Sequence, residues 1–142
     1  MASPGLPDIV QAVIDYLKAD TELAAYGVPA LGDHIYRVGE IPSFPQFPVI
    51  EISKVDNLRG DHTSTSKNST TRIQCTITAK NDPDADGLTE LVGHRLDCKT
   101  NTAIGTAYII QSFDAGVTSD HSPKIPLYVY HRDFRIMYSV RI

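Results

Sequence analysis

The 142-residue sequence lacks long apolar segments, an excess of basic residues and a cysteine framework. No apolar run approaches the roughly 20 residues that span a bilayer, so we expect no membrane contact. The N-terminus lacks the basic and apolar regions of a signal peptide, and a cytosolic origin is the expectation. Two cysteines do not make a disulfide framework, and we expect free thiols. A net charge of −4 argues against a general nucleic-acid binder.

Common catalytic motifs are also absent from the sequence. It has no nucleophile elbow, glycine-rich phosphate loop, H-E-x-x-H or C-x-x-C, and its five histidines are scattered. His94 and Cys98 stand four residues apart, but they would need a third orienting group and a pocket to form a nucleophile and its base. We therefore predict no catalytic, cofactor or metal-binding residues, and a protein that is not an enzyme.

An acidic run at 82–87 resembles part of a metal-binding motif. Asp82, Asp84, Asp86 and Gly87 match the opening of a calcium loop, D-x-D-x-D-G. The twelfth position, however, is Gly93 and not a bidentate glutamate. Acidic residues also suit the first turn of a helix, where its dipole stabilises them. A small cytosolic calcium-binding module or enzyme that uses the Asp82–Asp86 loop is therefore the alternative function.

Three prolines at a spacing of three form the most distinctive segment. Pro42, Pro45 and Pro48 alternate with Phe44 and Phe47. Each proline fixes φ and disfavours the α region for the residue before it, so the segment is expected to be an extended arm. Its aromatic side chains need an apolar surface, either on the same subunit or on a neighbour. The spacing also matches a polyproline ligand, which leaves a peptide-displaying adaptor open.

Hydrophobic periodicity predicts one α+β domain over residues 1–142, with a mixed, mainly antiparallel sheet and two helices packed on one face. Predicted helices cover 6–17 and 84–98, with a short helical turn at 21–26. Predicted strands cover 34–38, 49–55, 70–80, 108–113 and 126–142. Residues 56–69 should form a long polar hairpin loop, and 115–124 a polar connection. The last strand would span roughly 56 Å, so we expect a bend or bulge near Arg132, which interrupts its apolar face.

In this order, the elements resemble the tail terminator (tail completion) proteins of long-tailed, siphovirus-type bacteriophages. The resemblance rests on the helix at 9–17 followed by 23–25, the Ile35-Tyr36 element, the proline-flanked strand entry at 47–50, a helix after an acidic turn, and the closing strand at 131–136. It implies a structural virion protein that is assembled in the host cytoplasm. A related neck, head-closure or minor tail protein remains open.

The resemblance further implies a hexameric ring at the junction of tail and head. The ring would cap the tail tube, dock to the head connector, and let genomic DNA pass through its lumen without specific binding. Acidic subunits suit that passage. The expected subunit or tube interface comprises Pro42, Phe44, Pro45, Phe47, Arg59, Asp61, Lys67 and Arg132.

Overall fold

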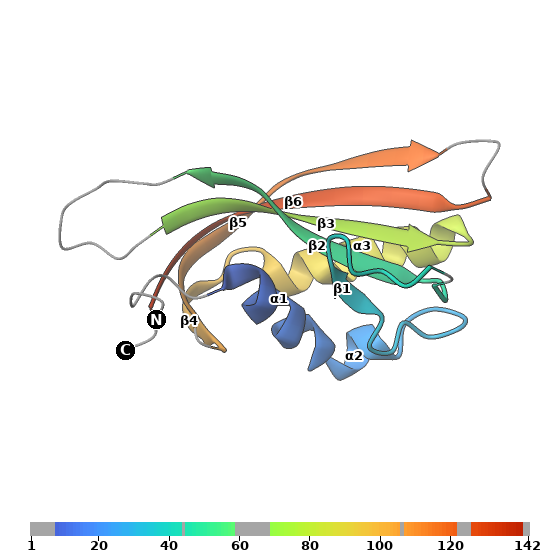
Figure 1. Cartoon of the computed structure of the whole chain (residues 1–142), viewed down its shortest axis with the longest axis horizontal. Helices are drawn as coiled ribbons and strands as arrows, with labels where there is room; N and C mark the ends of the chain where they lie inside the picture. Colours follow the sequence, from blue (N-terminus) through green and yellow to red (C-terminus); the bar gives the residue numbers. More distant parts are fainter. Residues whose placement is uncertain (1–7, 44, 59–68, 106, 122–125, 141–142) are drawn as a thin grey trace.

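The structure, a computed structural model, describes residues 8–43, 45–58, 69–105, 107–121 and 126–140. Its elements are α1 (Ile9–Lys18), α2 (Thr21–Ala24), β1 (Ile35–Arg37), β2 (Val49–Leu58), β3 (Ser69–Ala79), α3 (Asp82–Leu96), β4 (Thr100–Ile104), β5 (Ala107–His121) and β6 (Tyr128–Val140). The strands form one six-stranded sheet in the order β1-β2-β3-β6-β5-β4 (Figure 1). Among the described strands, β1 and β2 are the one pair that runs in parallel. The predicted α+β class with a mixed, mainly antiparallel sheet is confirmed.

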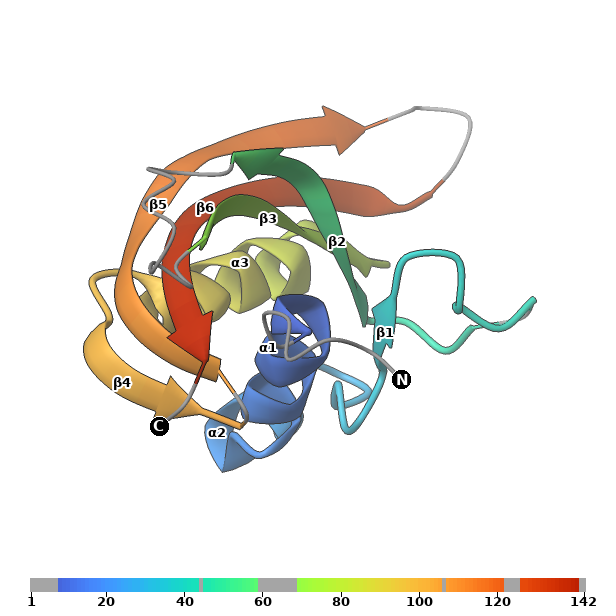
Figure 2. The same ribbon diagram turned by 60° about the vertical axis from the view of Figure 1, so that its left-hand side comes forward.

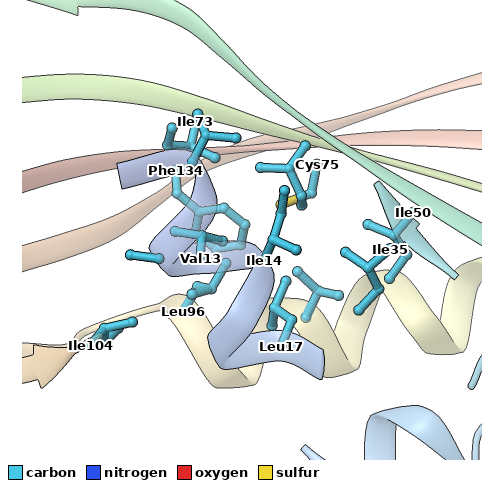
Figure 3. Close-up of a cluster of buried hydrophobic side chains, with 14 of the residues drawn as sticks. Val13, Ile14, Leu17, Ile35, Ile50, Ile73, Cys75, Leu96, Ile104 and Phe134 are labelled. Carbon is cyan, nitrogen blue, oxygen red and sulfur yellow. The ribbon is translucent and has the colours of Figure 1, made fainter. Parts of the chain in front are cut away.

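All the described helices lie on one side of the sheet, which curls around α1 and α3 (Figure 2). The apolar stripe predicted for the first helix is buried, from Ile9 to Leu17. On the sheet, Ile73, Cys75 and Ile77 of β3 are fully buried, as their alternation predicts. These side chains meet Phe134 of β6 in one core between the helices and the sheet (Figure 3). No described helix has the length and apolar character needed to cross a membrane.

Side-chain caps determine where the helices begin. Asp8 accepts a hydrogen bond from the Gln11 backbone N–H at 3.1 Å, and Asp20 accepts one from Leu23 N–H at 2.9 Å. Asn81 caps α3 by accepting from the Asp84 N–H at 2.8 Å. The third helix therefore begins at Asp82, two residues earlier than predicted, since a proline is tolerated in a first turn.

Two predictions for the second half of the sheet were wrong. Residues 115–121 are not a polar connection, because β5 continues to His121 and pairs with β6 along the way. Backbone pairing with a neighbouring strand holds this polar segment extended without a continuous apolar face. The strand β4 was not predicted either. Residues 56–58 and 69, predicted as part of a long loop, belong to strands, because β2 reaches Leu58 and β3 begins at Ser69. The rest of that predicted loop, 59–68, lies outside the described residues.

The expected irregularity near Arg132 lies in the neighbouring strand. β6 pairs with β3 without a register shift from Tyr138 to Tyr128. The shift is in β5, between Asp114 and Gly116, opposite Asp133 and Phe134. Because β6 has a partner on each side here, an extra residue in it would disrupt two ladders, whereas β5 has only one partner at this level.

Candidate assembly surfaces

The proline arm lies between β1 and β2, and its described residues form neither helix nor strand. Figure 2 shows it projecting away from the helices. Pro42 is exposed, whereas Pro45 and Phe47 are half-buried and Pro48 is buried. Phe44 lies outside the described residues. Phe47 therefore packs in part on its own subunit, whereas Pro42, Ser43 and Gln46 of the arm are exposed.

A turn at Gly27 anchors the last part of the arm. A Cβ on Gly27 would lie 3.4 Å from Cγ of Pro48, so the turn and the arm are in van der Waals contact. The carboxylate of Asp84 accepts the Val28 N–H at 3.1 Å and the side-chain N–H of Asn81 at 3.0 Å. The start of α3 thus holds the turn on which Pro48 rests.

The acidic run at 82–87 forms the first turns of α3 and not a calcium-binding loop. Asp84 is used in capping, and Asp82 accepts a hydrogen bond from the Tyr130 hydroxyl at 2.6 Å. That hydrogen bond, together with burial, raises the pKa of Tyr130 to about 12. Within the described ranges, no three acidic, histidine or cysteine side chains converge as a metal site would need. The loop geometry on which the calcium hypothesis depended is therefore not present.

Arg132 lies in a cluster that joins β5, β6 and α3. One of its terminal nitrogens is paired with Asp114, and the other donates to the Thr89 carbonyl at 3.1 Å and lies 3.6 Å from Glu90. The arginine side chain is only 12% exposed. It fits against α3 because Gly93 has no side chain, and a Cβ there would lie 2.5 Å from Cζ of Arg132. Arg132 was expected at an interface, and both its terminal nitrogens are engaged within the subunit.

The ion pairs of this fold lead us to expect loss of stability in acid. Burial raises the pKa of the Asp114 carboxyl, but the hydrogen bond from Arg132, the Gly116 N–H and the charge of Arg132 outweigh it and hold the pKa below its ordinary value. Burial also raises the pKa of the Asp20 carboxyl, but hydrogen bonds from the Leu23 N–H and Arg95 outweigh it and hold that pKa below its ordinary value. A lowered folded pKa stabilises the fold above the ordinary pKa, and that stability is lost as the pH falls.

Urea denaturation at a series of pH values measures this effect. The free energy of unfolding is expected to fall between about pH 5 and pH 3, because the unfolded carboxyls bind protons first. Asp114→Asn should be less stable at pH 7 and should lose less stability on acidification. Asp20→Asn is the matched comparison at the other ion pair. Parallel pH profiles for the three proteins would contradict the assignment.

The two margins of the sheet are each only half covered. β1 pairs with residues 50–52 of β2, which leaves 53–58 of that strand paired with β3 alone. At the other margin β4 covers 107–111 of β5, and β6 is the one strand that pairs with residues 113–121. Within this stretch the Asp114 N–H is donated to the Asp97 carboxylate at 2.7 Å and the Gly116 N–H to the Asp114 carboxylate at 3.1 Å, so the uncovered backbone groups lie mainly in 117–121. We call 53–58 the β2 half-edge and 113–121 the β5 half-edge. An uncovered strand edge offers backbone groups that can pair with another chain.

A groove adjoins the β2 half-edge at the point where β1 ends. Its volume is about 280 Å³. Val10, Val38 and Ile52 provide its apolar surface, and an ion pair between Asp8 and Arg37 at 2.5 Å lies beside them. The groove can therefore accommodate an apolar side chain from a strand laid along this edge.

The sheet face opposite the helices carries mostly polar side chains. Arg72 and Asp133 form an ion pair at 3.7 Å, and Thr76 lies 3.0 Å from the His131 ring. Phe113 and Met137 are the large apolar side chains on this face that are exposed among the described residues. The face is therefore compatible with contact to water or to a polar partner.

Comparisons with known proteins give one informative result. No protein-family model and no curated protein matches the sequence. A solved structure titled "Virion of native gene transfer agent (GTA) particle" contains a chain that superposes with a TM-score of 0.69. The alignment covers 92% of this chain and 94% of that chain at 16% sequence identity. The two chains share one fold. Because the match spans nearly all of both, the similarity concerns the whole domain and not a common supersecondary motif.

Sequence reasoning located some of these surfaces and missed others. It pointed to the proline arm and to Arg132, which the fold places on different parts of the molecule. Arg59, Asp61 and Lys67 lie outside the described residues. It missed both half-edges, since edge exposure depends on how far β1 and β4 extend, and this is decided by pairing between distant segments. The alternation of Phe113, Ala115 and Val117 with polar residues was the signal for the β5 half-edge.

Proposed function

We propose that this chain is a structural subunit of a phage-like virion, and that it forms a hexameric ring that caps the tail tube and joins it to the head connector. The observation that carries the proposal is the fold shared with a chain of the gene transfer agent virion, which extends over 92% of the present chain. The order of sequence elements that resembles tail terminator proteins supports the finer assignment.

Local features of the molecule support a structural role. The described charged groups with shifted pKa values include Asp20, Asp114 and Arg132, and each of them is held in an ion pair that connects different elements. Such ion pairs stabilise the fold. Because these charged groups already have ion-pair partners within the chain, they are not available to bind a substrate. The half-covered margins of the sheet provide surface for contact with other chains.

Light scattering coupled to size-exclusion chromatography tests the ring. The full chain is measured alone and after mixing with open tail tubes assembled from the tube protein of the same genome. We expect either a particle of about 94 kDa, which corresponds to six subunits of 15.6 kDa, or rings at the tube ends in negative-stain electron microscopy. Tubes that already carry a terminal cap are the control and should bind no additional protein.

Two results would contradict the proposal in different ways. A monomer that stays monomeric at high concentration and ignores open tubes contradicts the ring-forming role altogether. If the protein binds isolated head connectors but not tail tubes, the tail-capping role is contradicted and the role of a neck or head-closure protein is favoured.

A further inference from the structure

The two half-edges lie diagonally across the sheet. Residues 53–58 of β2 are level with 133–137 of β6, through their common partner β3. Residues 113–121 of β5 are level with 128–135 of β6. Figure 1 shows the ends of β2 and β5 at opposite ends of the sheet. Each molecule therefore offers one uncovered half-edge on each side, displaced by three or four residues, or roughly 12 Å, along the strands.

Both half-edges expose apolar side chains, and neither contains proline. Of the six large hydrophobic side chains that are exposed in the described residues, Val55 lies on the β2 half-edge, and Phe113 and Val117 lie on the β5 half-edge. Proteins usually protect sheet edges with proline, charge, a β-bulge or a covering segment. Each half-edge has one register shift, between Lys54 and Asp56 in β2 and between Asp114 and Gly116 in β5, and their other ionisable residues are Asp120 and His121. Without proline or a covering strand, the rest of each half-edge can pair with another strand.

The directions of the strands favour one arrangement of two copies. β2 and β6 run the same way, because each is antiparallel to β3, and β5 runs opposite to both. A neighbour related by rotation about a ring axis keeps the same strand order, so its β5 half-edge arrives antiparallel to β2. Antiparallel pairing is the more stable ladder. The diagonal displacement corresponds to the stagger that tilted strands require when a sheet closes on itself.

We propose that the β5 half-edge of one copy pairs with the β2 half-edge of the next copy, so that the sheets of successive subunits become continuous. The contact is head-to-tail, which leaves the same two half-edges free at the ends of any open chain of subunits until the ring closes. An apolar side chain of the incoming strand enters the groove beside Ile52. The pairing of edges depends on self-association of this chain, and its use in a tail ring rests on the proposed function.

Cross-linking between introduced cysteines tests this pairing. Cys98 is exposed and is first replaced by asparagine, because the residue has a φ of 56° that asparagine tolerates well. Cys75 can stay, since burial raises the pKa of its thiol and keeps it unreactive. One variant then carries Val55→Cys and a second carries Val117→Cys. The two are mixed under conditions of assembly and treated with a short bismaleimide.

Covered positions of the same strands provide the matched control. Glu51 lies where β1 covers β2, and Gln111 lies where β4 covers β5. We expect the mixture of cysteines at 55 and 117 to cross-link at least on the order of tenfold faster than the mixture of cysteines at 51 and 111, because assembly raises the local concentration of the paired edges. A single chain with cysteines at both 55 and 117 should give a ladder of cross-linked species that ends at the closed ring.

The outcomes separate this pairing from the proposed function. Rings seen by light scattering without cross-links between 55 and 117 overturn the edge pairing and leave the ring function intact. Cross-links within either single variant alone indicate a symmetric dimer and also overturn it. Cross-links between 55 and 117 in a protein that does not bind tail tubes support the edge pairing and contradict the tail-capping function. A strict monomer with no cross-links overturns both.

Discussion

Phe134→Ala is expected to lower the free energy of unfolding by about 3–5 kcal/mol. Phe134 is fully buried in β6 and pairs across the sheet with Ile73. Figure 3 shows its ring between the sheet and Val13 of α1. Removal of the ring loses the transfer free energy of the side chain and leaves a cavity that the β6 ladders prevent from collapsing. Urea denaturation followed by circular dichroism measures the loss.

Phe113→Ala is the matched control for that substitution. Phe113 is in the adjacent strand on the opposite face of the sheet, and it is 44% exposed. Its removal should cost less than about 1 kcal/mol, because little buried surface is lost. Equal losses for the two variants would show that the core does not lie on the helix side of the sheet. Since Phe113 lies on the β5 half-edge, its alanine variant should instead weaken self-association.

Helices and the central strands could be predicted from the sequence, because their signals are local. The stripe from Ile9 to Leu17 follows the period of a helix, and the alternation of Ile73, Cys75 and Ile77 follows that of a strand with one buried face. Asp8 and Asp20, which cap α1 and α2, each accept a hydrogen bond from the N–H three residues further along the chain.

The second half of β5 could not be predicted in this way, because its strand structure depends on a distant segment. It contains Gly116 and several polar residues, and it pairs only with β6. β4 is short and mostly polar, and it includes Asn101 with a positive φ of 49°. Its sequence has little preference for a strand, and the backbone hydrogen bonds to β5 hold it extended. The half-edges follow from these two facts, so the surfaces that we propose to pair during assembly had only a weak signal in the sequence.

Arg132 illustrates a residue that could be singled out from the sequence but not assigned a role. It interrupts the apolar face of the last strand, which suggested a bend or bulge there, and it was also placed in the expected interface. Its partners Asp114 and Thr89 come from β5 and α3, and only the fold brings them together. The space it needs is provided by Gly93, a position with no signal in the periodicity of α3.

Arg132→Met is expected to destabilise the fold by about 2–4 kcal/mol, since it leaves the carboxylate of Asp114 unpaired in a site where its side chain is only 23% exposed. Methionine replaces much of the aliphatic part of the arginine side chain, so the loss of stability comes mainly from the unpaired carboxylate of Asp114. In the double variant Arg132→Met/Asp114→Asn that charge is absent. The double variant should therefore recover about 1–3 kcal/mol relative to Arg132→Met. Denaturation of the four proteins of this cycle at pH 7 gives the coupling free energy.

The same four proteins decide whether Arg132 also contacts another chain. If Arg132 acts only by holding β5 and β6 against α3, the double variant regains self-association in proportion to its regained stability. If the guanidinium also reaches a partner, the double variant recovers stability without recovering assembly, because methionine cannot replace the lost donors. Light scattering under the conditions of the ring measurement separates the two results. We expect the first, since burial leaves only 12% of the Arg132 side chain exposed and both terminal nitrogens are already engaged within the subunit.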